Sequence, residues 1–268
     1  VTEGQRYNFQ FYLFTEELKN TVVTAALLDC EEQIVVSKNF QIERDGSWNH
    51  YEGAFTVDTT ANDLRFALLL PHKGKVYIDF VSMFPENTFC GHKNGLREDV
   101  AGMLRDLRPD FVRWPGGCIV EGLTMDNRIK WKETIGDIVK RPGEYNLWGY
   151  RSTYGFGYHE FLQFCEDIDA DGLFVCNAGM SCLFRNGDYW EEENRIDNLI
   201  QDALDAVEYA LGDTTTVYGK RRAENGHAAP FPLKYVEVGN ENVGLRYVKN
   251  YNRFYKAIKE KYPQIEVV

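Results

Sequence analysis

Three kinds of signal are missing from this 268-residue sequence, and each absence argues against a class of protein. The six cysteines form no Cys-x-x-Cys pair and the five histidines no His-Glu-x-x-His motif, so we assign no metal site and expect no cofactor. No apolar run approaches the roughly 20 residues that span a bilayer. Basic residues are few: 30 Lys and Arg stand against 41 Asp and Glu. This balance disfavours nucleic acid and anionic membranes as partners, because both bind basic surfaces.

Aromatic residues, by contrast, are abundant, with 16 Tyr, 17 Phe and 5 Trp. The apolar faces of sugar rings pack on aromatic side chains, so this composition suits a protein that binds carbohydrate. A core rich in aromatic residues explains the same numbers equally well. Composition alone leaves both explanations open.

Residues 1–85 are predicted to form an antiparallel β-sandwich. Short β-rich segments follow one another at roughly regular spacing, turn residues separate them, and no helical period exceeds two turns. The predicted strands are 7–14, 21–28, 33–36, 40–42, 50–57, 64–70 and 76–84.

Residues 86–268 alternate between helices and strands, which is typical of a parallel α/β fold. The predicted strands are 110–114, 173–176, 235–238 and a stub at 265–268, and the predicted helices are 94–107, 159–168, 196–212 and 247–262. Three strands and a stub are too few for a complete (β/α)₈ barrel, so we expect part of one. Because the chain starts at Val1 and ends in a beginning strand, we expect a fragment without the first and the C-terminal barrel strands.

The stretch Val238-Gly-Asn-Glu241 ends one of these strands. Ligands bind at the carboxyl ends of parallel strands, and a carboxylic acid beside an amide is equipped for proton transfer to a polar substrate. Arg113 and Asn177 end the two other strands. A guanidinium there needs a carboxylate or substrate oxygens opposite it. A structural ion pair for Arg113, and backbone contacts for Asn177, are the competing explanations.

Further carboxylates lie near the same predicted face. They are Glu121, Asp188 and Glu191, and spacing alone does not rank them as catalytic. Glu237 precedes Glu241 by four residues, and we expect it to point into the strand layer and to be structural.

Five separated motifs then occur in one order. They are F-V-R-W-P-G-G at 111–117, Gly136, N-A-G at 177–179, R-A-E-N-G-H at 222–227 and V-G-N-E at 238–241. Together they resemble the α-L-arabinofuranosidases of glycoside hydrolase family 51, in a clan of retaining (β/α)₈ barrels. The resemblance covers roughly residues 85–268. Residues 1–84 resemble a carbohydrate-binding-module-type jelly roll, either as a packing spacer or as a module that binds glycan.

The resemblance implies a role for each matched residue. Glu241 corresponds to the general acid/base, Asn240 to the amide that bonds a sugar hydroxyl in the −1 subsite, and Arg113 to an arginine beside the nucleophile.

Three further positions are implied to contact or approach the substrate. Asn177 lies near the site in this resemblance, and Trp131 matches a loop tryptophan close to the substrate. Cys118 stands where many members have Asn. A thiol cannot reproduce the paired hydrogen bonds of an amide, so the sugar contact at Cys118 and the exact sugar preference stay open.

A retaining glycosidase uses two carboxylates about 5–5.5 Å apart. The resemblance puts the nucleophile beyond Val268, so we expect it outside this chain and expect these 268 residues alone to be inactive. The implied substrates are arabinose-containing plant polysaccharides or oligosaccharides. The implied location is secreted or periplasmic, although no signal peptide is present.

Two other functions remain open. The first is another retaining member of the clan, such as an endoglucanase or a β-xylosidase. The second is a non-catalytic glycan-binding protein.

Overall fold

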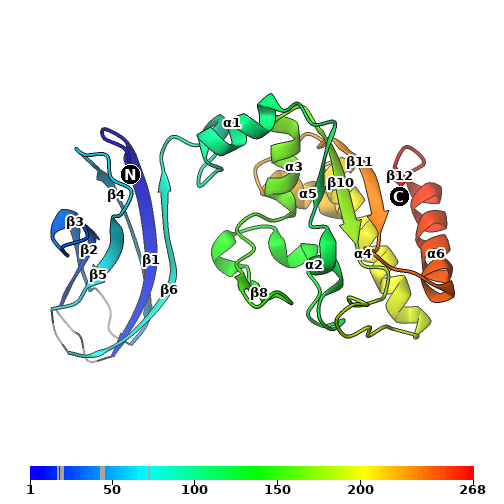
Figure 1. The fold of residues 1–268 in the computed structure, drawn as a ribbon, viewed down its shortest axis with the longest axis horizontal. Helices are drawn as coiled ribbons and strands as arrows, with labels where there is room; N and C mark the ends of the chain where they lie inside the picture. Colours follow the sequence, from blue (N-terminus) through cyan, green and yellow to red (C-terminus); the bar gives the residue numbers. More distant parts are fainter. Residues whose placement is uncertain (17, 19–20, 43–45, 72) are drawn as a thin grey trace. The chain divides into compact units, whose positions relative to one another are not determined.

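The computed structural model describes residues 1–16, 18, 21–42, 46–71 and 73–268. The chain forms two compact units, Val1–Met103 and Leu104–Val268 (Figure 1). In the described ranges, no helix is both long enough and apolar enough to cross a membrane.

The first unit consists of two three-stranded antiparallel sheets, in the orders β4-β1-β6 and β3-β2-β5. The strands are β1 (Arg6–Glu16), β2 (Val22–Leu28), β3 (Ile34–Gln41), β4 (Trp48–Thr56), β5 (Arg65–Leu69) and β6 (Lys75–Pro85). The predicted antiparallel β architecture is therefore confirmed. The division into strands at 33–36 and 40–42 was wrong, because β3 runs through the polar residues between them. As an edge strand it can expose such side chains to solvent.

Alternation along β1 separates a buried face from an outer face. Phe9 stacks on Phe55 of β4 with ring centroids 4.4 Å apart and meets Phe40 of β3 edge-on, so both sheets share one core. On the outer face, Phe14 contacts Trp48 of β4 and Tyr77 of β6. Trp48 and Tyr77 stay 51% and 42% exposed. The first unit thus carries an aromatic row on its outer surface.

The second unit is organised around a parallel sheet in the order β12-β11-β10-β7. Its strands are β7 (Phe111–Trp114), β10 (Asp171–Cys176), β11 (Leu233–Val238) and β12 (Glu266–Val267). All four predicted strands are present. A separate two-stranded ribbon pairs β8 (Glu144–Tyr145) with β9 (Arg151–Ser152).

The helices are α1 (Glu98–Asp106), α2 (Gly117–Glu121), α3 (Tyr158–Asp167), α4 (Glu193–Leu211), α5 (Val217–Glu224) and α6 (Leu245–Lys261), with short 3₁₀ turns at Phe89–Gly91, Trp131–Thr134 and Ile138–Lys140. The helix expected from residue 94 begins at Glu98. Asn94 has φ +54°, which is not the extended conformation of a helix N-cap. The short helices α2 and α5 were not predicted, because neither is long enough for an apolar period to stand out.

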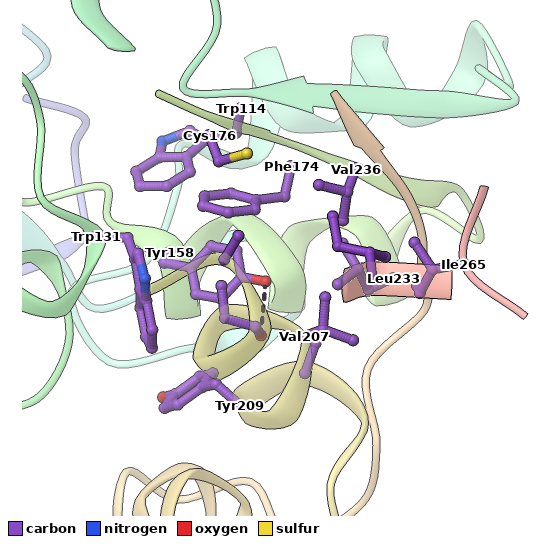
Figure 2. Packing of buried hydrophobic residues seen from close by; sticks show 14 of the residues in the cluster. Trp114, Trp131, Tyr158, Phe174, Cys176, Val207, Tyr209, Leu233, Val236 and Ile265 are labelled. Atoms are coloured by element: carbon purple, nitrogen blue, oxygen red, sulfur yellow. Dashed lines mark hydrogen bonds between the residues drawn. The ribbon is translucent and has the colours of Figure 1, made fainter. Parts of the chain in front are cut away.

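The core of the second unit packs α3 and α4 against the sheet (Figure 2). The ring of Tyr158 on α3 packs against Trp114 of β7 and Phe174 of β10. Its hydroxyl donates to the Ala206 carbonyl of α4 at 3.0 Å. Helices α3 and α4 therefore cover this face of the four-stranded sheet.

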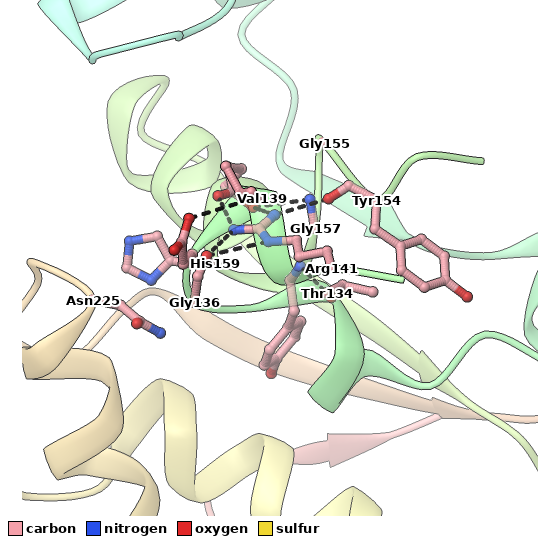
Figure 3. Close-up of polar contacts among 12 residues, drawn as sticks. Thr134, Gly136, Val139, Arg141, Tyr154, Gly155, Gly157, His159 and Asn225 are labelled. Carbon is pink, nitrogen blue, oxygen red and sulfur yellow. Dashed lines mark hydrogen bonds and ion pairs between the residues drawn. The ribbon is translucent and has the colours of Figure 1, made fainter. Parts of the chain in front are cut away.

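The long segment between β7 and α3 is held by Arg141 (Figure 3). Its guanidinium donates to both carboxylate oxygens of Glu160 at 2.7 and 2.9 Å and to the carbonyls of Gly136 and Tyr154. Glu160 in turn accepts from the Gly157 N–H at the start of α3. One arginine thus anchors the predicted loop region to α3.

Arg222 of α5 is fully buried. Its guanidinium donates to carbonyls at the end of α4 and in the loop before β11, namely those of Tyr209, Ala210, Gly212, His227 and Ala228, at 2.7–3.2 Å. This single side chain donates to carbonyls at the C-terminal end of α4, of which that of Ala210 also accepts the Phe231 N–H.

We predict that Arg222→Met lowers the free energy of unfolding by at least about 3 kcal/mol, because it removes five hydrogen bonds to buried and partly buried carbonyls. Urea denaturation measures the effect. The matched control is the exposed neighbour Arg221→Met, which should change stability by less than about 0.5 kcal/mol. Equal effects of the two substitutions would contradict the assigned role.

Candidate active site

The candidate site lies where β11 ends and the chain turns at Gly239. Gly239 has φ +82°, and a Cβ there would collide with the side chain of Asn242. Its N–H donates to the Cys176 carbonyl at the end of β10, at 2.7 Å. Glu241 also adopts a left-handed conformation, with φ +50°. This turn places Asn240 and Glu241 at the carboxyl edge of the parallel sheet.

Arg113 connects β7 to β11 across the intervening strand β10. Its Nε donates to Glu237 Oε2 at 2.6 Å, and its Nη2 donates both to Glu237 Oε1 and to Asn240 Oδ1, the latter at 2.9 Å. Glu237 raises the pKa of the guanidinium. Gly116, in the Pro-Gly-Gly motif, leaves the space that the guanidinium occupies. Glu237 thus supplies the carboxylate that the sequence required opposite Arg113.

Glu121 of α2 holds the other side of the Asn240 amide. Its carboxylate accepts from Asn240 Nδ2 at 3.3 Å and from Asn242 Nδ2 at 2.7 Å. The side chain is 1% exposed, and burial raises the pKa of the carboxyl group. The Asn240 amide is therefore fixed in one orientation, with oxygen toward Arg113 and nitrogen toward Glu121. Spacing did not single out Glu121, and Asn242 was missed altogether.

Glu241 itself is exposed, and its Oε2 lies 3.9 Å from the thiol of Cys118. Burial, and the neighbouring Cys182 thiol, raise the pKa of Cys118 to about 11, so Cys118 is a protonated thiol at neutral pH. The structure thus brings Arg113, Asn240, Glu241 and Cys118 together. An exposed carboxylate stands beside an amide fixed by hydrogen bonds, which is an arrangement that can transfer a proton to a bound substrate.

Asn177 and Trp131 form hydrogen bonds within the protein's own structure. Asn177 donates to the carbonyls of Val120 and Met180, each at 3.0 Å, and accepts from the Gly179 N–H, so its amide joins α2 to the loop after β10. Trp131 is 5% exposed, and its Nε1 donates to the Asp202 carbonyl within the core of the second unit. Their predicted contacts with substrate stay predictions, since both side chains are engaged in the protein's own packing.

The remaining candidate carboxylates bond elsewhere. Asp188 accepts from the Met125 N–H at 3.2 Å, and Glu191 pairs with Arg246 at 3.3 Å. Glu121 and Glu237 support Asn240 and its neighbours, whereas Glu241 is exposed and directly follows Asn240.

Comparison with known proteins identifies the family of this site. A family model described as "Alpha-L-arabinofuranosidase 1 domain" matches residues 103–268. This chain belongs to the α-L-arabinofuranosidases of glycoside hydrolase family 51. The resemblance predicted from the five motifs is confirmed.

Curated relatives of this arabinofuranosidase chain match its full length and are themselves longer chains. The extracellular exo-α-L-arabinofuranosidase of Streptomyces chartreusis is 35% identical over 280 residues, covering 100% of this chain and 33% of the relative. Alpha-L-arabinofuranosidase 1 of Arabidopsis thaliana is 36% identical over 271 residues, covering 100% and 39%. The chain thus spans between a third and two fifths of these curated relatives.

Solved structures agree with this membership. The arabinose-bound family-51 α-L-arabinofuranosidase MgGH51 superposes with a TM-score of 0.91 at 29% identity, covering 100% of this chain and 44% of that one. The α-L-arabinofuranosidase from Thermotoga maritima, in complex with arabinose, gives 0.51 at 26% identity over 64% of this chain and 33% of that one.

We predict that Glu121→Gln loosens the turn that carries Glu241. A glutamine side chain turns an NH₂ group toward the amide of Asn240 or Asn242, so at least one of the two hydrogen bonds is lost. Hydrogen exchange at residues 239–242 should accelerate by about tenfold, corresponding to the loss of about 1.4 kcal/mol of local protection. Glu192→Gln, at an exposed position before α4, is the control and should leave this segment unchanged. Unaltered exchange in Glu121→Gln would contradict the anchoring role.

Proposed function

We propose that this chain supplies the general acid/base half of a retaining α-L-arabinofuranosidase. The observation that carries the proposal is the exposed Glu241 carboxylate at the end of β11, next to an Asn240 amide fixed between Arg113 and Glu121. The substrates are arabinose-containing plant polysaccharides or oligosaccharides, and their processing is extracellular. The extracellular relative from Streptomyces chartreusis supports this location.

In this mechanism Glu241 protonates the glycosidic oxygen as the bond to the leaving group breaks. A second carboxylate about 5–5.5 Å away attacks the anomeric carbon, and Glu241 then removes a proton from water to release the sugar. We place the nucleophile outside these 268 residues. Asn240 keeps unused hydrogen-bonding capacity on its amide for a sugar hydroxyl, and Arg113 stays oriented by Glu237.

The architecture that fits this role is a jelly-roll module over residues 1–85 and part of a (β/α)₈ barrel over 86–268. Four parallel strands that follow one another in chain order, with helices between them, support the barrel assignment. On this assignment, Arg113, Asn177 and Asn240 with Glu241 come from the ends of three consecutive strands, which is where barrel enzymes carry their active sites.

We predict that Glu241→Gln lowers kcat/KM by about 10²–10⁴-fold in a longer chain that carries a complete barrel. The assay is hydrolysis of aryl α-L-arabinofuranosides. The loss should be largest for poor leaving groups, because good ones depart without a proton. Azide should restore turnover by replacing water in the second step. The 268-residue chain alone should be inactive.

Three outcomes would overturn parts of this proposal. An unchanged kcat/KM in Glu241→Gln removes Glu241 from the reaction. Turnover by the 268-residue chain that Glu241→Gln abolishes puts a nucleophile inside it. Faster hydrolysis of an aryl β-D-xyloside or β-D-glucoside than of the arabinofuranoside favours another retaining member of the clan. The exposed Glu192→Gln serves as the control for unspecific losses.

A second candidate function, glycan binding by the first unit, is favoured by its aromatic row. Trp48 and Tyr77 flank Phe14 on the outer face of the β4-β1-β6 sheet and are largely exposed, as a platform for sugar rings requires.

We predict that Trp48→Ala weakens binding to arabinan or arabinoxylan about threefold to tenfold, through loss of one stacking contact. Isothermal titration calorimetry measures the affinity. Trp148→Ala, at a tryptophan of similar exposure in the second unit, is the matched control. Binding that is insensitive to Trp48→Ala but lost in Glu241→Ala would assign glycan recognition to the second unit instead.

A further inference from the structure

Three potential metal ligands converge beside Glu241. The sulfur atoms of Cys118 and Cys182 and a carboxylate oxygen of Glu121 all lie within 4.8 Å of one another. Cys118 and Glu121 are three residues apart on α2, so their side chains share one side of the helix. Cys182 comes from the loop that follows β10. Neither Cys118 nor Cys182 is in a disulfide.

The backbone around the three residues is fixed. The Cys182 N–H donates to the Gly122 carbonyl at 3.1 Å, and the Cys182 carbonyl accepts from three N–H groups of residues 185–187. The Asn177 amide also joins α2 to this loop through the carbonyls of Val120 and Met180. The ligand spacing is therefore set by the fold, as a preorganised metal site requires.

No basic side chain of the described residues pairs with Glu121. Glu121 is 1% exposed, and its partners are the neutral amides of Asn240 and Asn242 and the thiol of Cys182. Within the described ranges, no lysine, arginine or histidine forms an ion pair with it. A bound cation would supply the positive charge that the described residues do not place next to this carboxyl group. Each carboxylate oxygen accepts one amide N–H and keeps a further lone pair for a ligand.

We propose that Cys118, Glu121 and Cys182 bind a soft divalent cation of the Zn²⁺ type. Thiolates select such cations, and two thiolates with one carboxylate form three corners of a tetrahedral site. Zn–S bonds of about 2.3 Å span sulfur separations of roughly 3.7 Å, which is within the 4.8 Å that encloses the three ligand atoms. Asn240 and Asn242 then form the outer hydrogen bonds that ligating carboxylates normally have. Binding releases the two thiol protons to solvent.

Oε2 of Glu241 lies 3.9 Å from the Cys118 sulfur, so the proposed cation would stand next to the carboxylate of the candidate site. The metal site rests on its three ligand residues and does not depend on the proposed function.

Anaerobic titration of the fully reduced protein with Co²⁺ tests the binding. We expect a thiolate-to-cobalt charge-transfer band and intense tetrahedral visible bands that saturate at one Co²⁺ per chain and disappear when Zn²⁺ is added. C118S and C182S should abolish the charge-transfer signal or halve it, and E121Q should weaken Co²⁺ binding at least about tenfold. C90S, at an exposed cysteine of the first unit, is the matched control and should bind as the parent protein does.

Circular dichroism confirms folding of each variant. Asn242→Ala adds a measurement that leaves all three ligands in place, and it should weaken Co²⁺ binding about 10–100-fold through the loss of an outer hydrogen bond.

Several results would overturn the proposal. The first is that the reduced parent protein with Co²⁺ shows no charge-transfer band. The second is an unchanged spectrum in the C118S/C182S double variant. The third is a Cys118–Cys182 disulfide, seen by mass spectrometry as a loss of two hydrogens, in a protein that binds no Co²⁺ after reduction. Because the readout is spectroscopic, failure here leaves the proposed acid/base role of Glu241 untouched, and failure of that role leaves metal binding untouched.

Discussion

The guanidinium of Arg113 is the contact on which the site in the second unit depends. It reaches from β7 over β10 to Glu237 and Asn240 on β11, so it ties together strands that do not pair with each other. The span suits arginine, because its planar fork can bond a carboxylate with two N–H groups and still reach an amide oxygen. Asn240 also donates to Glu121 of α2, and this hydrogen bond fixes α2 against the end of β11.

This chain of contacts leaves one carboxylate exposed beside two fixed groups. Asn240 and Glu121 are nearly buried and hydrogen-bonded, whereas Glu241, the residue after Asn240, is exposed. Under the proposed mechanism a general acid/base approaches two different oxygens in succession, and an exposed carboxylate beside a fixed amide suits that role. The same geometry places the sulfur atoms of Cys118 and Cys182 within 4.8 Å of a Glu121 carboxylate oxygen. These three residues form the metal site proposed above.

Much of the fold could be predicted because local patterns carry it. Short buried runs such as 173–176 and 235–238 mark parallel strands, and alternation in residues 7–14 marks a half-buried antiparallel one. The ends of helices and the shortest helices were harder to predict from the sequence. Asn94 resembles a helix cap in sequence but adopts a left-handed backbone, and α2 has only five residues, too few for a helical period. Trp131 illustrates the same limit for the site, because nothing in its loop sequence indicates that its Nε1 donates to the Asp202 carbonyl of α4.

By itself, the sequence determined the order of the four parallel strands and of the longer helices of the second unit, the strand-end position of Arg113, Asn177, Asn240 and Glu241, and the family. All of these follow from patterns between near neighbours in the chain or from motifs at fixed spacing. Only the tertiary structure decided that Glu237 pairs with Arg113, that Glu121 orients Asn240, and that Cys118, Glu121 and Cys182 meet. Those partners are up to 124 residues apart, and their contact depends on strand register and on how α2 packs, which no local pattern encodes.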